Sequence, residues 1–145
     1  MENLKKFNEY LADLSIWTMK LHNLHWNVRG TQFMSIHLFT EKEYKKSFER
    51  IDELAEHIKM FGYFPVSSYK EQLEISHLEE EKARSFQDIE ALRIIKRDMN
   101  ILKEIAIKLR KICDEQSWFN AVSLFEAHIK DYNKQLWFIS SILEE

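Results

Sequence analysis

Apolar residues recur at alternating steps of three and four along four stretches of this chain. This spacing places them on one face of an α-helix, which then buries that face against its neighbours. The stretches are long, and short segments join the first to the second and the third to the fourth. The pattern predicts four helices, over residues 3–28, 33–61, 80–113 and 119–143.

Glycine and proline mark where the first two helices are expected to end. Gly30 and Gly62 follow the last periodic residues, where a left-handed backbone conformation suits glycine, and Pro65 prevents the second helix from continuing. The acidic run 79–81 favours a helix start there, because negative charge stabilises a helix N-terminus.

The same pattern names the residues that we expect in the core. Cys113 is among them, so we interpret it as a small buried hydrophobe rather than a reactive thiol. The predicted core positions are Leu4, Phe7, Leu11, Leu14, Thr18, Leu21 and His25; Tyr44, Phe48, Ile51, Ala55 and Ile58; Leu92, Ile95, Met99, Leu102, Ala106, Leu109 and Cys113; and Val122, Phe125, Ile129, Tyr132, Leu136, Ile139 and Leu143.

The connection between the second and third helices is the longest in the chain. With about 17 residues it exceeds a tight turn, and it suggests a crossover between two antiparallel helix pairs. Within it, Ser68 can cap a short extra helix, and Glu71 completes a capping box. We therefore predict an all-α, single-domain four-helix bundle over 1–145 with a short extra helix in this connection.

Composition narrows the function classes. The 145 residues include only 2 Gly and 1 Pro, too few for the turns of a β-sandwich, a barrel or a Gly-rich nucleotide-binding fold. A net charge of -3 gives no global reason to bind nucleic acid or an anionic membrane. No run approaches the roughly 18 apolar residues of a membrane span. With one cysteine and no signal-peptide pattern, we expect a soluble, cytoplasmic protein.

One face of the predicted helix 33–61 combines four potential metal ligands. His37 and Glu41 form one pair at i, i+4, and Asp52 and Glu56 form another. All four project within an arc of about 100° around the helix. The alternative interpretation is a solvated charge stripe, because repulsion between exposed carboxylates is mild.

The two pairs cannot share one ion within a chain. Glu41 and Asp52 are separated by about 16 Å of helix rise, whereas each ligand of an ion lies about 2.2 Å from it. An antiparallel copy of the helix, related by a two-fold axis near Lys46 and Ser47, would bring the first pair of one subunit opposite the second pair of the other. His25, at the end of the preceding helix, is then a candidate third ligand from the first subunit.

Two imidazoles and three carboxylates suit iron, zinc or manganese, and the oxygen-rich balance favours ferric iron. A di-iron centre inside one bundle would instead need carboxylates on two helices and Glu-x-x-His on two others. The chain offers that motif only once, from Glu74 to His77 in the long connection. We therefore interpret this motif as chance.

Several segments resemble the Dps family of mini-ferritins. The first is LHNLHWNVRG from Leu21 to Gly30, followed by Phe33 and His37. The second is DELAE over 52–56, with Gly62 and Pro65 after it, and the third is KQLWFI over 134–139. With the predicted short helix after Pro65, the resemblance covers nearly the whole chain.

The resemblance implies a ferroxidase that assembles as a hollow dodecamer. Ferrous iron would be oxidised at two-fold interfaces, with hydrogen peroxide or oxygen, and stored inside as a ferric mineral, without an organic cofactor. The expected ligands are His25, His37, Glu41, Asp52 and Glu56. Trp26 lies beside that centre, either as a sink for oxidising equivalents or as packing at the helix corner.

The chain departs from the family pattern at three positions. Glu41 stands where the family usually has Asp. His57 stands where the family commonly has Arg, so we expect it to be either a weaker, pH-sensitive hydrogen-bond partner or an extra ligand. Ser123 replaces an Asp that often lines the three-fold iron-entry pore. We expect Asp114 and Glu126 to supply negative potential there instead.

Two other functions compete with iron oxidation. The first is DNA coating, which in this family often uses a mobile cationic tail. Here only Lys5 and Lys6 precede the body of the first helix, so we expect little or no direct DNA binding at physiological salt. The second is a structural helical-bundle dimer without chemistry, in which the acidic face of helix 33–61 is merely hydrated.

Overall fold

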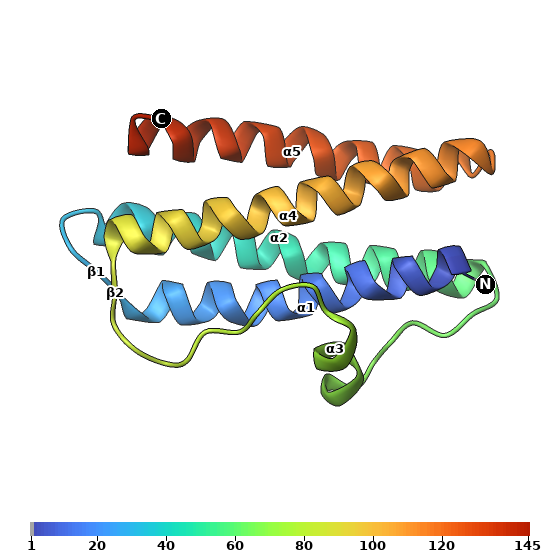
Figure 1. Cartoon of the computed structure of the whole chain (residues 1–145), viewed down its shortest axis with the longest axis horizontal. Coiled ribbons are helices and arrows are strands. Elements are labelled where there is room, and N and C mark those ends of the chain that lie inside the picture. Colours follow the sequence, from blue (N-terminus) through green and yellow to red (C-terminus); the bar gives the residue numbers. More distant parts are fainter. Residues whose placement is uncertain (1) are drawn as a thin grey trace.

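Two helical hairpins lie side by side in the computed structural model, which describes residues 2–145 (Figure 1). The first hairpin joins α1 to α2, the second joins α4 to α5, and a long connection that includes α3 crosses between them (Figure 1). This is the predicted all-α bundle with a crossover. The elements are α1 (Glu2–Asn27), β1 (Val28–Arg29), α2 (Phe33–Met60), α3 (Tyr69–Ile75), β2 (Phe86–Gln87), α4 (Asp88–Glu115) and α5 (Phe119–Leu143).

Three of the four long helices begin and end within about one residue of the predicted bounds, the usual uncertainty of helix ends. The start of α4 was predicted wrongly. The helix begins at Asp88 and not near 80 because β2 pairs in parallel with β1, Val28 against Phe86. This pairing holds the chain extended just before Asp88, so the acidic run 79–81 belongs to the connection.

Gly30 has the left-handed conformation predicted for it, with φ of 120°. A side chain at this position would also meet the α4 N-terminus, because a Cβ atom would lie 2.5 Å from Oδ2 of Asp88. That oxygen accepts a hydrogen bond from the backbone N of Gln32 at 3.1 Å. Glycine at this corner therefore lets the α1–α2 turn contact the start of α4.

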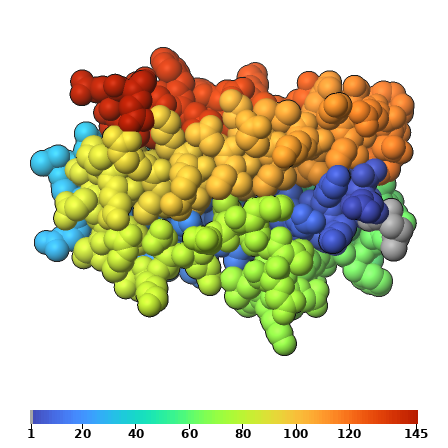
Figure 2. Space-filling model, in the orientation of Figure 1, coloured from blue at the N-terminus to red at the C-terminus, as the bar shows by residue number. Residues whose placement is uncertain are grey.

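The connection 61–87 packs along α1, and polar side chains of α1 bind its backbone. Lys20 donates to the carbonyl of Glu79 at 2.6 Å, and the Asn23 amide donates to the carbonyl of Glu81 at 3.1 Å. Buried backbone groups outside regular structure need such partners. In Figure 2 the connection and α4 cover most of α1 on this face. As predicted, Ser68 caps α3, its hydroxyl accepting from the backbone N of Glu71 at 3.3 Å.

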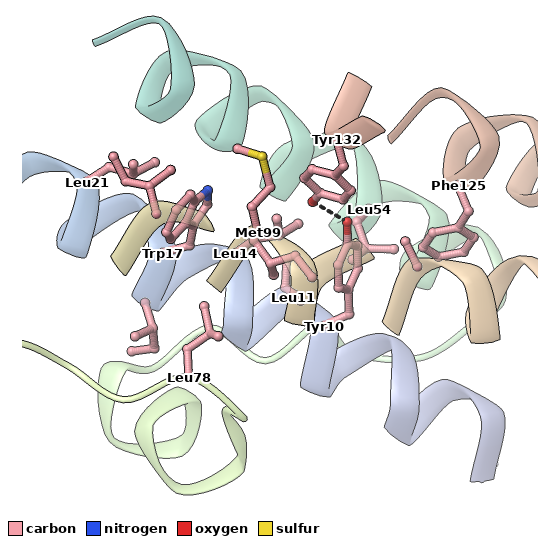
Figure 3. Packing of buried hydrophobic residues seen from close by; sticks show 14 of the residues in the cluster. Tyr10, Leu11, Leu14, Trp17, Leu21, Leu54, Leu78, Met99, Phe125 and Tyr132 are labelled. Atoms are coloured by element: carbon pink, nitrogen blue, oxygen red, sulfur yellow. Dashed lines mark hydrogen bonds between the residues drawn. The ribbon is translucent and has the colours of Figure 1, made fainter. Parts of the chain in front are cut away.

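The core lies between the four long helices (Figure 3). All seven predicted positions of α4 are buried, including Cys113, and burial raises the pKa of its thiol to about 12. The prediction for Phe48 was wrong, since 70% of its side chain is exposed. The buried face of α2 instead combines three large apolar side chains with three polar ones, so the apolar spacing alone located it only in part. That buried face comprises Ile36, Thr40, Glu43, Ser47, Leu54 and Ile58.

None of the helices within residues 2–145 combines the length and the apolar character that a membrane span needs.

A buried histidine in this core should make stability depend on pH. Burial, with the nearby charge of Arg50, lowers the pKa of His128 to about 3. Below pH 6.5 the unfolded chain binds a proton at this imidazole that the folded chain does not, so stability falls as pH drops from 6.5 towards 3. At pH 4.5 the loss is about 2–3 kcal/mol relative to pH 7.

Urea unfolding at pH 7 and pH 4.5, at fixed protein concentration, measures this loss. Because carboxylates also titrate in this range, the quantity of interest is the difference between the wild type and His128→Leu. The variant should lose less stability on acidification. An equal loss in both proteins would contradict the expectation.

Candidate metal centre

His25 and His37 are joined across the α1–α2 corner by reciprocal hydrogen bonds. Nδ1 of His25 donates to the carbonyl oxygen of His37 at 2.7 Å, and Nδ1 of His37 donates to the carbonyl oxygen of His25 at 2.8 Å. Their rings stack with centroids 3.7 Å apart and planes 11° apart. The two imidazoles therefore form one rigid unit at the end of the hairpin.

These bonds fix the tautomer of both rings. A carbonyl oxygen only accepts, so each Nδ1 carries the proton and each neutral ring keeps its lone pair on Nε2. Thr40 adds a further partner, with its hydroxyl oxygen 3.2 Å from Nδ1 of His25. Burial lowers the pKa of His25, which favours its neutral form. Both Nε2 atoms are thus prepared to bind a metal ion, the arrangement that orients histidine ligands in metalloproteins.

The predicted carboxylates lie on α2, apart from one another along the helix. Glu41 is half-buried and pairs loosely with Lys45 at 3.5 Å, whereas Asp52 and Glu56 are exposed. Within residues 2–145, the structure brings no three His, Cys, Asp or Glu side chains together to hold an ion. The structure therefore groups His25 and His37 but leaves Asp52 and Glu56 remote from them in the same chain.

Exposed apolar residues share the helical face of these carboxylates. Met34, Leu38 and Phe48 lie within the same arc of about 80° around α2 as Glu41, Asp52 and Glu56. Their side chains are 59%, 53% and 70% exposed. Exposed apolar side chains rimmed by polar groups are typical of a protein interface.

The two-fold axis expected near Lys46 and Ser47 stays a prediction, and these two residues do not themselves belong to the exposed face. Ser47 is buried and donates to the carbonyl of Leu14 at 3.1 Å, while Lys46 binds Asp131 of α5 at 2.7 Å. Both side chains point into their own bundle. They lie near the middle of α2, and the exposed side chain in that part of the helix is Phe48.

Sequence reasoning missed an aromatic neighbour of the histidine pair. Tyr44, assigned to the core, meets the ring of His25 edge-on at 5.3 Å and stacks on His22 at 3.8 Å. His22 in turn lies 5.3 Å from Trp26. The spacing His22, His25 and Trp26 on α1 was the available signal. Trp26 is 63% exposed, so in this chain it does not pack the helix corner.

The other residues singled out from the sequence lie away from this unit. His57 projects about 100° around α2 from Glu56 and so leaves the candidate ligand face. At the opposite end of the bundle, Arg110 lies 3.5 Å from Asp114 and 3.9 Å from Glu126. This cation offsets the negative potential that we expected from those two acids.

The Glu-x-x-His segment of the connection has a structural role. Its histidine, His77, donates from Nδ1 to Oδ2 of the fully buried Asp13 at 2.7 Å, and the hydroxyl of Ser76 donates to the other oxygen at 2.7 Å. Glu74 is exposed. The segment therefore anchors the connection to α1.

Comparison with known proteins identifies the family. The family model of the ferritin-like domain matches residues 4–145. A DNA protection during starvation protein (Dps) of Helicobacter pylori is 27% identical over 143 residues, which cover 99% of each chain. The chain belongs to the Dps family of ferritin-like proteins. The resemblance seen in the sequence is thereby confirmed.

Solved structures agree with this assignment. A Dps protein from Bacillus brevis is 25% identical, with a TM-score of 0.92, and the match covers 97% of this Dps-family chain and 94% of that one. Antigen TpF1 from Treponema pallidum has the same fold with a TM-score of 0.96 at 24% identity, over 99% of this chain and 92% of that one.

Proposed function

We propose that this Dps-family chain is a ferroxidase that stores iron and detoxifies it in the cytoplasm. Two copies would pair through the exposed face of α2. Each of the two resulting sites would take His25, His37 and Glu41 from one copy and Asp52 and Glu56 from the other. Six such pairs would form a hollow dodecamer that holds the ferric mineral, as the family resemblance implies.

The observation that carries this proposal is an incomplete ligand set beside an unpartnered interface. Two imidazoles have their Nδ1 atoms bound and their Nε2 atoms prepared for a metal. The remaining donors lie on a helical face whose exposed apolar side chains favour contact with another protein surface. A second copy related by a two-fold axis would satisfy both needs at once, because such an interface is self-complementary.

The donor set suits ferrous iron as substrate. Three carboxylates offset the charge of the bound cations, and two neutral imidazoles add nitrogen ligands that iron accepts. The reciprocal carbonyl bonds hold both rings in place, so little ordering is needed when iron binds. Hydrogen peroxide would take one electron from each of two ferrous ions, its O–O bond breaking and two protons completing two water molecules.

Keeping iron and peroxide at one protein site limits the release of hydroxyl radicals. The exposed Trp26, close to His22, is then available to donate an electron to an oxidant that escapes. Glu41 reaches farther than the Asp usual in this family by one methylene group. We propose that it reaches the same ions from a backbone position slightly farther away.

Native mass measurement after loading with ferrous iron and peroxide tests this function directly. We expect a shell of twelve copies that gains mass as iron is retained. A dimer that keeps no iron would support the structural alternative and contradict the proposal. Titration of the metal-free shell should also show binding in fixed proportion to the number of two-fold interfaces.

Direct DNA coating is the alternative function. Lys5 and Lys6 are exposed but belong to the first turns of α1, so their cations are held on a helix. Attachment to phosphates needs several mobile cations in one region, and each neutralised phosphate contributes separately to affinity. We therefore propose that protection arises from iron chemistry and not from coating DNA.

A further inference from the structure

A chain of three polar side chains crosses the apolar core far from the histidine pair. The hydroxyl of Tyr10 on α1 lies 2.7 Å from the hydroxyl of Tyr132 and 2.9 Å from Nδ1 of His128, both on α5 (Figure 3 shows the two tyrosines). All three side chains are buried, with at most 3% exposed. The proposed ferroxidase site uses none of these three side chains.

Counting donors and acceptors orders the protons in this group. Each phenol has one proton, and the described residues offer these two hydroxyls only each other and Nδ1 of His128 as partners. Nε2 of His128 is buried and has no partner among the described residues in either case. If Nδ1 donated its own proton, one phenolic proton would also remain buried without an acceptor, whereas the reverse order leaves only the N–H of Nε2 unpaired. In the favoured order Tyr132 donates to Tyr10, and Tyr10 donates to Nδ1 of His128.

We propose that Tyr10 is a buried redox site, which gives one electron to a strong oxidant while its phenolic proton moves to His128. This role goes beyond iron binding. A phenol is hard to oxidise when its proton has nowhere to go, because the oxidised phenol is a strong acid. An imidazole nitrogen in direct hydrogen-bond contact removes this obstacle, and Tyr132 then stabilises the resulting oxygen-centred radical by donating to it.

The step balances with hydroxyl radical as the oxidant, which ferrous iron and hydrogen peroxide produce together. One electron leaves Tyr10 and reduces hydroxyl radical to hydroxide, and the O–H proton of Tyr10 forms an N–H bond at Nδ1 of His128. Return of one electron from a reductant such as a second ferrous ion reverses the proton movement. Burial lowers the pKa of His128 to about 3, so before oxidation the imidazole is neutral and able to accept.

The fold offers a route from the iron end to this site along α1. Trp17, which is 2% exposed, lies seven residues from Tyr10 and eight from His25. These separations correspond to about 10 and 12 Å of helix rise, so a single indole divides the path into two steps. All three side chains point to the buried side of α1. The inference that iron chemistry oxidises Tyr10 rests on the proposed function. The inference that Tyr10 is a redox site does not.

Photo-oxidation of the metal-free protein tests the site without iron. A ruthenium tris-bipyridine sensitiser with persulfate supplies the oxidant, and freeze-quenched samples are measured by high-field electron paramagnetic resonance. We expect a long-lived tyrosyl radical whose g-values report a hydrogen bond. The signal should be lost in Tyr10→Phe and retained in Tyr69→Phe, which removes a tyrosine that is 84% exposed.

Two further variants separate redox chemistry from packing. In Tyr132→Phe, which keeps the ring shape, the radical should form with g-values shifted towards those of a weaker hydrogen bond. In His128→Leu the radical yield should fall, because the proton has lost its acceptor. An unchanged signal in Tyr10→Phe, or unchanged yield in His128→Leu with native circular dichroism, would overturn the proposal.

Repeating the measurement with ferrous iron and peroxide separates this inference from the proposed function. A Tyr10 radical in both experiments supports both. If light generates the radical but iron does not, the redox site stands and its coupling to iron oxidation fails. If iron is oxidised and no Tyr10 radical forms by either route, the ferroxidase stands and the redox site is refuted.

Discussion

Co-expression of His37→Ala with Asp52→Ala should restore about a quarter of the wild-type iron-oxidation sites, although each variant alone is inactive. Each variant damages both sites of a symmetric pair, because every site needs His37 from one copy and Asp52 from the other. A mixed pair contains one doubly damaged site and one intact site. Half of randomly formed pairs are mixed, so about one site in four is complete.

The expected loss of activity in each single variant follows from the removal of one metal ligand. Loss of a residue that merely supports a metal ligand costs about 10–100-fold in affinity or activity, so loss of a ligand should cost about 100-fold or more. Peroxide-driven oxidation of ferrous iron, followed optically, measures the rate. Differently tagged variants allow the mixed assemblies to be purified and counted.

Glu53→Ala is the matched control. Glu53 is exposed on α2 and adjacent to Asp52, but it projects about 100° around the helix from Asp52 and lies outside the arc of the ligand face. This variant should oxidise iron like the wild type and assemble normally. If the mixed assemblies stay inactive while keeping wild-type size, the two residues do not meet across an interface, and the shared-site proposal fails.

Lys20→Met should lower the free energy of unfolding by about 3 kcal/mol, because it leaves a buried carboxylate without its main partner. Nζ of Lys20 lies 2.6 Å from Oδ2 of Asp98, and both side chains are almost wholly buried. The same ammonium donates to the carbonyl of Glu79. Arg97 is the second partner of Asp98, at 3.1 Å, and moderates the loss. Urea unfolding at pH 7 measures it.

Two variants control for the cause of this loss. In Lys20→Met combined with Asp98→Leu no unpaired charge remains at this position, so stability should recover most of the way. Lys45→Met breaks an exposed ion pair with Glu41 and should change stability little, since such pairs contribute little in water. Equal stability of Lys20→Met and the wild type would show that the buried pair does not stabilise the fold.

Much of the fold could be predicted from periodicity alone. The apolar spacing of α1, α4 and α5 names most core residues correctly, although Thr18, Ile129 and Leu143 are only half-buried. Burial on one face of a long helix imposes the same spacing wherever the helix packs. Phe48 shows the limit of this reasoning. It continues the apolar pattern of α2, yet its side chain is exposed in this chain. Apolar spacing by itself does not tell whether a position faces the chain's own core.

The candidate site was likewise only partly predictable from the sequence. Spacing placed His37, Glu41, Asp52 and Glu56 on one side of α2 and excluded a shared ion within one chain. It could not give the crossed carbonyl bonds of His25 and His37, which depend on the exact approach of two helices. For the same reason Tyr44 was assigned to the core rather than to this corner.

The sequence by itself determined most helix bounds and buried faces and the set of candidate donor residues, because these follow from local periodicity and side-chain chemistry. Tertiary structure decided the start of α4 and the protonated nitrogens of His25 and His37. It also decided the meeting of Tyr10 with His128 across the core. Each of these depends on contacts between residues distant in the chain, and local spacing carries no information about such contacts.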